Sequence, residues 1–206
     1  MARLCILVSG GEYHPIPQPE EGAFVIACDR GYDYARRCGI TPDLVVSDFD
    51  SSQTAVEAGV PVRRLPTEKD DTDTMSALRF ALEHGFREIH LVCALGGRLD
   101  HLIANLQSAL FAALRGAQVQ IHAADTEICT LRHGSMTLPR REGFSLSLFA
   151  AEDRCRGVCV SGVKYPLTDA ELTCSFPLGV SNEWAADEAE LAVREGTLLI
   201  VLCRMP

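Results

Sequence analysis

The chain has 206 residues, 47% hydrophobic and 23% charged, a composition that predicts one large or two small packed domains and excludes wholesale disorder. Its net charge of −9 and pI of about 5.1 exclude a general nucleic-acid binder, which needs a basic face, and suit a site that gathers cations. No apolar run reaches the roughly 18 residues of a membrane span, and the start of the chain lacks a cleavable signal. The nine cysteines form no CxxC pairs, so we expect reduced thiols in a cytoplasmic protein. From the charge and the apolar runs we expect no nucleic-acid and no membrane partners.

Strand and helix patterns alternate over roughly the first 125 residues. Short apolar runs predict strands at 4–8, 24–28, 44–46, 62–65, 89–95 and 119–123. Helical spacing and glycine stops predict helices at 30–39, in a short segment that ends near 59, at 72–86 and at 102–114. Nearly continuous apolar strands separated by helices indicate a parallel sheet that is covered on both faces.

The helical rhythm stops near residue 125. Alternating or short apolar runs then predict strands at 145–148, 155–160, 171–176, 190–193 and 198–203. Glu195 and Gly196 separate the last two runs, which is a hairpin signal. The sequence therefore predicts an α/β domain over 1–125, with three layers, and an all-β domain over 126–206.

Charged residues follow four successive strands of the predicted parallel sheet, at the edge where such sheets bind ligands. In chain order they are Asp29; Asp48 and Asp50; Lys69, Asp70, Asp71 and Asp73; and Arg98, Asp100 and His101. A single Asp after a strand is explained by helix capping, and for Asp100 alone that interpretation is preferred. The whole set is not explained in that way, because two charges 4 Å apart at a dielectric near 20 repel by about 4 kcal/mol.

A cation among the carboxylates would remove this repulsion. Oxygen-rich sites select magnesium, which bridges carboxylates to substrate phosphates. Lys69 and Arg98 supply positive charge for phosphate oxygens. The pattern therefore indicates metal-assisted phosphoryl chemistry. Neither a GxxxxGK[ST] loop, nor GxGxxG after the first strand, nor GxSxG is present, which argues against P-loop, ordinary dinucleotide and nucleophile-elbow enzymes.

Taken together, these junctions resemble the thiamine diphosphokinase (thiamine pyrophosphokinase) family. The matching segments occur in the family's order and span nearly the whole chain: Cys28–Gly31, Pro42–Ser51, Thr67–Asp73, Gly96–His101 with Asn105, Gly162–Leu167, and Ser181–Asn182. The chain departs from the pattern at Ser47, where the family usually has glycine before Asp-Phe-Asp-Ser. The added Cβ restricts the backbone of that loop but leaves the carboxylates in place.

The resemblance implies an N-terminal ATP- and Mg²⁺-binding domain, a C-terminal β-sandwich that binds thiamine, and a homodimer. By motif match, the metal ligands would be Asp29, Asp48, Asp50 and Asp73. ATP would be bound by Asp29, Gly31, Lys69, Asp70, Arg98 and Asp100, and thiamine by Ser181 and Asn182. The resemblance also implies that the thiamine hydroxyl attacks the β-phosphorus of ATP and that AMP leaves, with Asp48, Asp50, Asp73, Lys69 and Arg98 as the catalytic residues.

Trp184, the only tryptophan, offers a flat face suited to a pyrimidine ring or a cationic thiazolium. A core or dimer contact explains it equally well. Two other functions stay open: a pyrophosphokinase for a pterin alcohol, which would use much the same ATP site, and a non-catalytic nucleotide or thiamine sensor. Lys164–Leu167 and Ser181–Asn182 in an all-β domain favour thiamine over a pterin, and the carboxylate set argues against a sensor.

Overall fold

A computed structural model describes residues 3–48, 55–66 and 71–206. The chain divides into two compact units, residues 1–124 and 125–206, so the division falls one residue before the predicted position. Among the described residues, no helix combines the length and apolar character that a membrane span requires.

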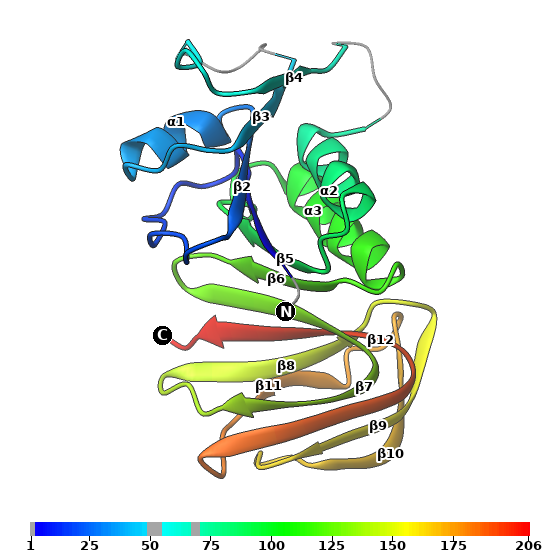
Figure 1. The fold of residues 1–206 in the computed structure, drawn as a ribbon. Coiled ribbons are helices and arrows are strands. Elements are labelled where there is room, and N and C mark those ends of the chain that lie inside the picture. The colour runs from blue at the N-terminus through cyan, green and yellow to red at the C-terminus, as the bar shows by residue number, and fades with distance from the viewer. Residues whose placement is uncertain (1–2, 49–54, 67–70) are drawn as a thin grey trace. The chain divides into compact units, whose positions relative to one another are not determined.

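The first unit is built on a parallel sheet. Its strands are β1 (Leu4–Val8), β2 (Phe24–Cys28), β3 (Leu44–Ser47), β4 (Val62–Arg64), β5 (Glu88–Val92) and β6 (Gln118–His122), and they lie in the order β6-β5-β1-β2-β3-β4 (Figure 1). β1 and β3 are almost entirely buried, as expected for strands that are covered on both faces. The order reverses between β1 and β5, and ligands bind beside such a switch point in open α/β sheets.

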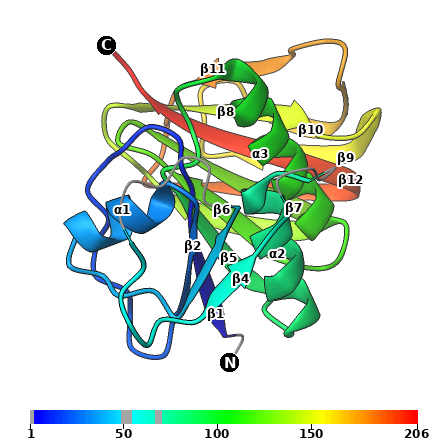
Figure 2. The same cartoon turned by 90° about the horizontal axis from the view of Figure 1, so that it is seen from above.

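Helices cover both faces of this sheet. One face carries α1 (Gly31–Arg37) and the other carries α2 (Asp73–Glu83) and α3 (Leu99–Ala113), as Figures 1 and 2 show from two directions. The Thr72 hydroxyl caps α2 by accepting a hydrogen bond from the Met75 amide at 3.1 Å. Gly39, at a φ of 72°, follows the end of α1, as the glycine stop predicts.

The second unit is all-β, with the strands β7 (Thr126–Pro139), β8 (Phe144–Ala150), β9 (Arg154–Ser161), β10 (Leu167–Thr173), β11 (Gly179–Asn182) and β12 (Glu188–Arg204). β12 pairs with β7 over most of its length, with β9 through its first half and with β8 through its second half. β10 extends the β9 side and β11 extends the β8 side, so the strands enclose one apolar core that includes Leu146, Leu191 and Ile200.

The mixed α/β, sheet-rich character predicted from the sequence is confirmed, but several elements differ. The predicted hairpin at Glu195–Gly196 is wrong, because the residues on both sides of it pair with the same strand: Val193 with Gly134 and Thr197 with Arg132. The extra residues form a bulge within β12, where Gly196 has a φ of 95°.

Other differences concern element ends. β7 and β11 were not predicted, and β10 begins at Leu167, before the predicted 171, and ends at Thr173. β5 stops at Val92, short of the predicted 95, because Cys93 adopts a φ of 53° that ends the ladder. Of the short helix predicted to end near 59, the described residues 55–59 contain only a turn.

Candidate active site

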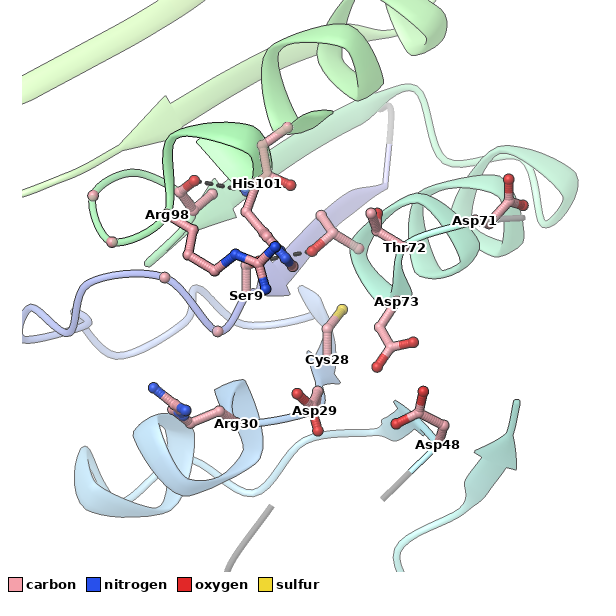
Figure 3. Close-up of a pocket in the computed structure, with 17 residues that line it drawn as sticks. Ser9, Cys28, Asp29, Arg30, Asp48, Asp71, Thr72, Asp73, Arg98 and His101 are labelled. Carbon is pink, nitrogen blue, oxygen red and sulfur yellow. Dashed lines mark hydrogen bonds between the residues drawn. The ribbon is translucent and has the colours of Figure 1, made fainter. Parts of the chain in front are cut away.

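A cavity of about 590 Å³ opens at the carboxyl edge of the parallel sheet. The ends of β1 and β2, the residues after β3 and β5, and the first turns of α2 and α3 all contribute to its wall (Figure 3). Its lining residues are Ser9, Gly10, Gly11, Cys28, Asp29, Arg30, Asp48, Asp71, Thr72, Asp73, Thr74, Ala94, Gly96, Gly97, Arg98, His101 and Asn105. The cavity thus collects most of the described charged residues that the sequence placed at this edge.

Three carboxylates converge on one side of the cavity. Asp29 follows β2, Asp48 follows β3 and Asp73 begins α2, and Figure 3 shows the three side chains turned toward one another. Each offers an oxygen, and these oxygens all lie within 4.8 Å of one another. All three residues are half-buried. A set of carboxylate oxygens at this spacing fits a hard divalent cation such as Mg²⁺.

The backbone holds Asp29 in an uncommon conformation. Its φ is 51°, in the left-handed region that non-glycine residues rarely adopt. The Asp29 amide donates to the Val46 carbonyl at 3.0 Å, and its carbonyl accepts from the Tyr32 amide at 3.0 Å. The hydroxyl of Ser47 donates to Oδ1 of Asp29 at 3.3 Å. The chain therefore turns sharply after β2 and presents the Asp29 carboxylate beside the end of β3.

Asp73 is fixed by the start of α2. An acidic residue in the first turn interacts favourably with the helix dipole. The next residue, Thr74, is buried, and its hydroxyl lies 2.7 Å from that of Ser9 at the end of β1. This buried pair joins the first turn of α2 to the residue that follows the central strand β1, so it fixes the position of the backbone that carries Asp73.

Positive charge comes to the cavity from Arg98 and Arg30. The Arg98 guanidinium donates to both Asp100 carboxylate oxygens, Nε to Oδ1 at 3.1 Å and Nη2 to Oδ2 at 2.5 Å. This pairing raises the pKa of Arg98 above its usual value and lowers the pKa of the Asp100 carboxyl. Asp100 thus orients Arg98. Arg30 was not among the predicted site residues, although it directly follows Asp29 and its position next to that carboxylate was a usable signal.

Two glycines allow close approach of backbone segments behind the carboxylates. A Cβ on Gly31 would lie 2.0 Å from the Val8 carbonyl oxygen, and one on Gly11 would lie 2.7 Å from the carbonyls of Cys93 and Leu95. Gly31 was predicted to bind ATP; in the structure its Cα packs against the end of β1, which sets where α1 starts. Sequence reasoning also missed Thr74 and the hydroxyl contacts of Ser9 and Ser47.

Asn105 and His101 belong to α3. Asn105 is buried and donates to the Ala94 carbonyl at 2.7 Å, so it anchors the helix to the segment after β5. His101 lines the cavity, and its amide donates to Oδ1 of Asp100 at 2.9 Å. The predicted site residues Asp50, Lys69 and Asp70 lie outside the described residues.

The three residues predicted to bind thiamine lie in or beside β11. Asn182 is buried; its Oδ1 accepts from the amides of Tyr165 and Glu183 at 3.0 Å each, and its Nδ2 donates to the Tyr165 carbonyl at 2.8 Å. Trp184 donates from Nε1 to the Phe144 carbonyl at 2.9 Å and packs against the core of the unit. Ser181 is exposed at a φ of 57°. The contacts of Asn182 and Trp184 give both residues a structural role in the loop and the core.

Two family models match the sequence in succession. They are described as "Thiamin pyrophosphokinase, catalytic domain", over residues 19–121, and "Thiamin pyrophosphokinase, vitamin B1 binding domain", over residues 135–198. The fold, the carboxylate cavity and these matches make the chain an enzyme of the kinase class of transferases. More specifically, the chain belongs to the thiamin pyrophosphokinase family, and it pyrophosphorylates thiamine to form thiamine diphosphate.

Individual relatives agree with this assignment. The chain is 25% identical over 205 residues to a thiamine pyrophosphokinase of Bacillus subtilis, an alignment that covers 95% of this chain and 96% of the relative. It is similar to the crystal structure of thiamin pyrophosphokinase from Geobacillus thermodenitrificans, with a TM-score of 0.82, 28% identity and 97% of each chain covered. The crystal structure of the Bacillus subtilis enzyme shares the fold, with a TM-score of 0.89 at 24% identity over 98% of this chain and 99% of that one.

Proposed function

We propose that the chain transfers the pyrophosphoryl group of ATP to the hydroxyl of thiamine, with AMP as the second product, and that it does so with Mg²⁺. The observation that carries this proposal is the convergence of three carboxylates, with oxygens within 4.8 Å of one another, in a cavity that also holds arginines. Carboxylates alone would repel a polyphosphate, whereas a cation bound between the carboxylates and the phosphates attracts both.

Asp29, Asp48 and Asp73 would hold the metal, together with Asp50. A divalent ion at this position supplies Lewis acidity and neutralises phosphate charge. Arg98, oriented by Asp100, and Arg30 supply donors for phosphate oxygens at the same cavity. Lys69 and Asp70 remain proposed ATP contacts on the strength of their motif. Positioning and charge neutralisation are the main contributions expected of the protein in such a reaction.

The decisive experiment measures AMP release from ATP by the purified chain with thiamine and Mg²⁺, alongside controls with EDTA and without thiamine. We expect AMP and thiamine diphosphate in equal amounts only when all components are present. Asp48→Asn should lower turnover by about 100-fold or more, the magnitude typical of losing one electrostatic group in an active site. Asp153→Asn makes the same change at an exposed carboxylate of the second unit and should leave turnover unchanged.

Other outcomes identify the alternatives. AMP that forms equally well without thiamine would contradict the acceptor assignment. Pterin alcohols that outcompete thiamine would instead indicate a pterin pyrophosphokinase. Thiamine that binds without any AMP release would indicate a sensor.

For the second unit, we propose that its β11 region binds thiamine and takes part in a homodimer. The hydroxyl of Ser181 is the exposed candidate for a thiamine contact. Phe176, Leu178 and Val180 are 65%, 49% and 47% exposed next to or within β11, which pairs only with β8 among the described strands. Exposed apolar residues along an open strand edge support association with a second copy of the chain.

A cytoplasmic location is supported by the cysteines, all of which are free thiols.

A further inference from the structure

Ser47 lies at the end of β3, directly before Asp48, and it is 0% exposed. Its hydroxyl donates to Oδ1 of Asp29 at 3.3 Å. Ser47 is therefore connected to two of the three converging carboxylates, because it precedes Asp48 in the chain and donates a hydrogen bond to Asp29.

The hydroxyl contact restricts the terminal torsion of the Asp29 side chain, which the backbone does not fix. The φ of 51° and the amide hydrogen bond to Val46 fix where the Asp29 side chain starts. They do not fix how the carboxylate rotates about its terminal bond, since that torsion is broad for Asp. A donor on one oxygen restricts this rotation, and the carboxylate keeps lone pairs for a cation.

We propose that Ser47 is a positioning residue for the divalent cation: its hydroxyl orients the Asp29 carboxylate toward Asp48 and Asp73. This inference rests on the proposed Mg²⁺ site. Hydrogen-bond partners behind metal ligands orient those ligands, and their loss typically weakens metal binding by about 10- to 100-fold. The separation of 3.3 Å is long for a hydroxyl donor, so the effect belongs at the lower end of that range.

The test measures Mn²⁺ binding to the full chain, without nucleotide or thiamine, by calorimetry or by the loss of the free-ion electron paramagnetic resonance signal. We expect Ser47→Ala to weaken Mn²⁺ binding by about tenfold. Ser47→Gly should do the same, since it also lacks the hydroxyl, and it serves if the alanine variant folds poorly. The matched control is Ser108→Ala, which removes another buried serine hydroxyl of the same unit, one that donates to the Ala104 carbonyl. Thermal melting in EDTA verifies that each variant is folded.

Mn²⁺ binding separates failure of the metal site from failure of the positioning role of Ser47. If the wild-type chain does not bind Mn²⁺, the metal site is refuted and the role of Ser47 falls with it. If the wild type binds Mn²⁺ and folded Ser47→Ala binds it equally well, only the positioning role is refuted. Tighter binding by Ser47→Gly than by the wild type would also refute it, because backbone freedom would then matter more than the hydroxyl.

Discussion

Gly31→Ala separates a structural role for this glycine from the direct ATP contact predicted from the motif. Gly31 is the buried first residue of α1 and lies two residues after Asp29. A Cβ placed on it would be 2.0 Å from the Val8 carbonyl oxygen and 2.7 Å from the Val8 carbonyl carbon. Both atoms belong to the main chain of the central strand β1, so no side-chain rotation can relieve the contact.

The size of the effect follows from these distances. Real Cβ contacts stay above 3.0 Å, so α1 and β1 must separate by about 1 Å (3.0 − 2.0). Overpacking of this kind costs about 1–3 kcal/mol, and a contact with rigid main chain belongs at the upper end. Alanine returns about 1 kcal/mol through its helix propensity. We expect a net loss of about 2 kcal/mol, which lowers the melting temperature by roughly 4–8 °C for a chain of this length.

The turnover of the folded variant should also fall, by more than the small loss of folding stability can explain. A displacement of about 1 Å at α1 moves Asp29 relative to Asp48 and Asp73, and misplacement on that scale costs about 100-fold in rate. Thermal melts and AMP release of the variant test both effects. The control is Gly10→Ala, where a Cβ would lie 3.4 Å from the Cβ and 3.8 Å from the amide nitrogen of Arg30, which is ordinary van der Waals contact. A Gly31→Ala chain that melts within about 1 °C of Gly10→Ala and keeps wild-type turnover would refute the packing argument.

Two further predictions concern other parts of the chain. Burial, reinforced by His122, lowers the pKa of His90 from 6.5 to about 4, so the unfolded chain binds this proton first and stability falls as pH drops from 6.5 toward 4. Urea unfolding at pH 7 and pH 4.5 should show that His90→Gln removes about 2 kcal/mol of this loss; an unchanged difference between the two pH values would contradict the shift. Val180→Glu places a charge among the exposed apolar residues in and next to β11, and light scattering should show a dimer for the wild type and a monomer for this variant. A wild type with a mass near 22.4 kDa would contradict the proposed dimer.

Most elements of the first unit could be predicted from the sequence because they depend on local pattern. β1 and β2 are short apolar runs, and α2 begins at the cap that Thr72 supplies. The second unit was harder, because its long antiparallel strands are defined by their partners. The Glu195–Gly196 pair is a turn signal in isolation, and pairing of both flanks with β7 makes it a bulge instead. Nothing within residues 188–204 shows that pairing.

The candidate site was likewise predictable only in part. The position of Asp29, Asp48 and Asp73 at one edge follows from topology, since parallel strands bring their carboxyl ends together. The contacts around them were not predictable, because they join residues distant in the chain: Ser9 with Thr74, and Ser47 with Asp29. A serine or threonine at these positions carries no signal in the sequence, and only the folded structure shows which residue its hydroxyl contacts.

Backbone strain at the strand ends connects the fold to the chemistry. Asp29 and Cys93 both take positive φ directly after a strand of the parallel sheet, a conformation that costs about 1–3 kcal/mol for a non-glycine residue. At Cys93 the amide donates to Nε2 of the buried His14 at 3.1 Å, which compensates the turn with a buried contact. At Asp29 the turn brings a carboxylate to within 4.8 Å of two others and adds repulsion to strain. The hydrogen bonds of the Asp29 amide to the Val46 carbonyl and of the Tyr32 amide to the Asp29 carbonyl hold the turn, and a cation bound between the three oxygens would offset the repulsion. The geometry of the turn at Asp29 therefore supports the proposed metal site, in addition to the sequence motif.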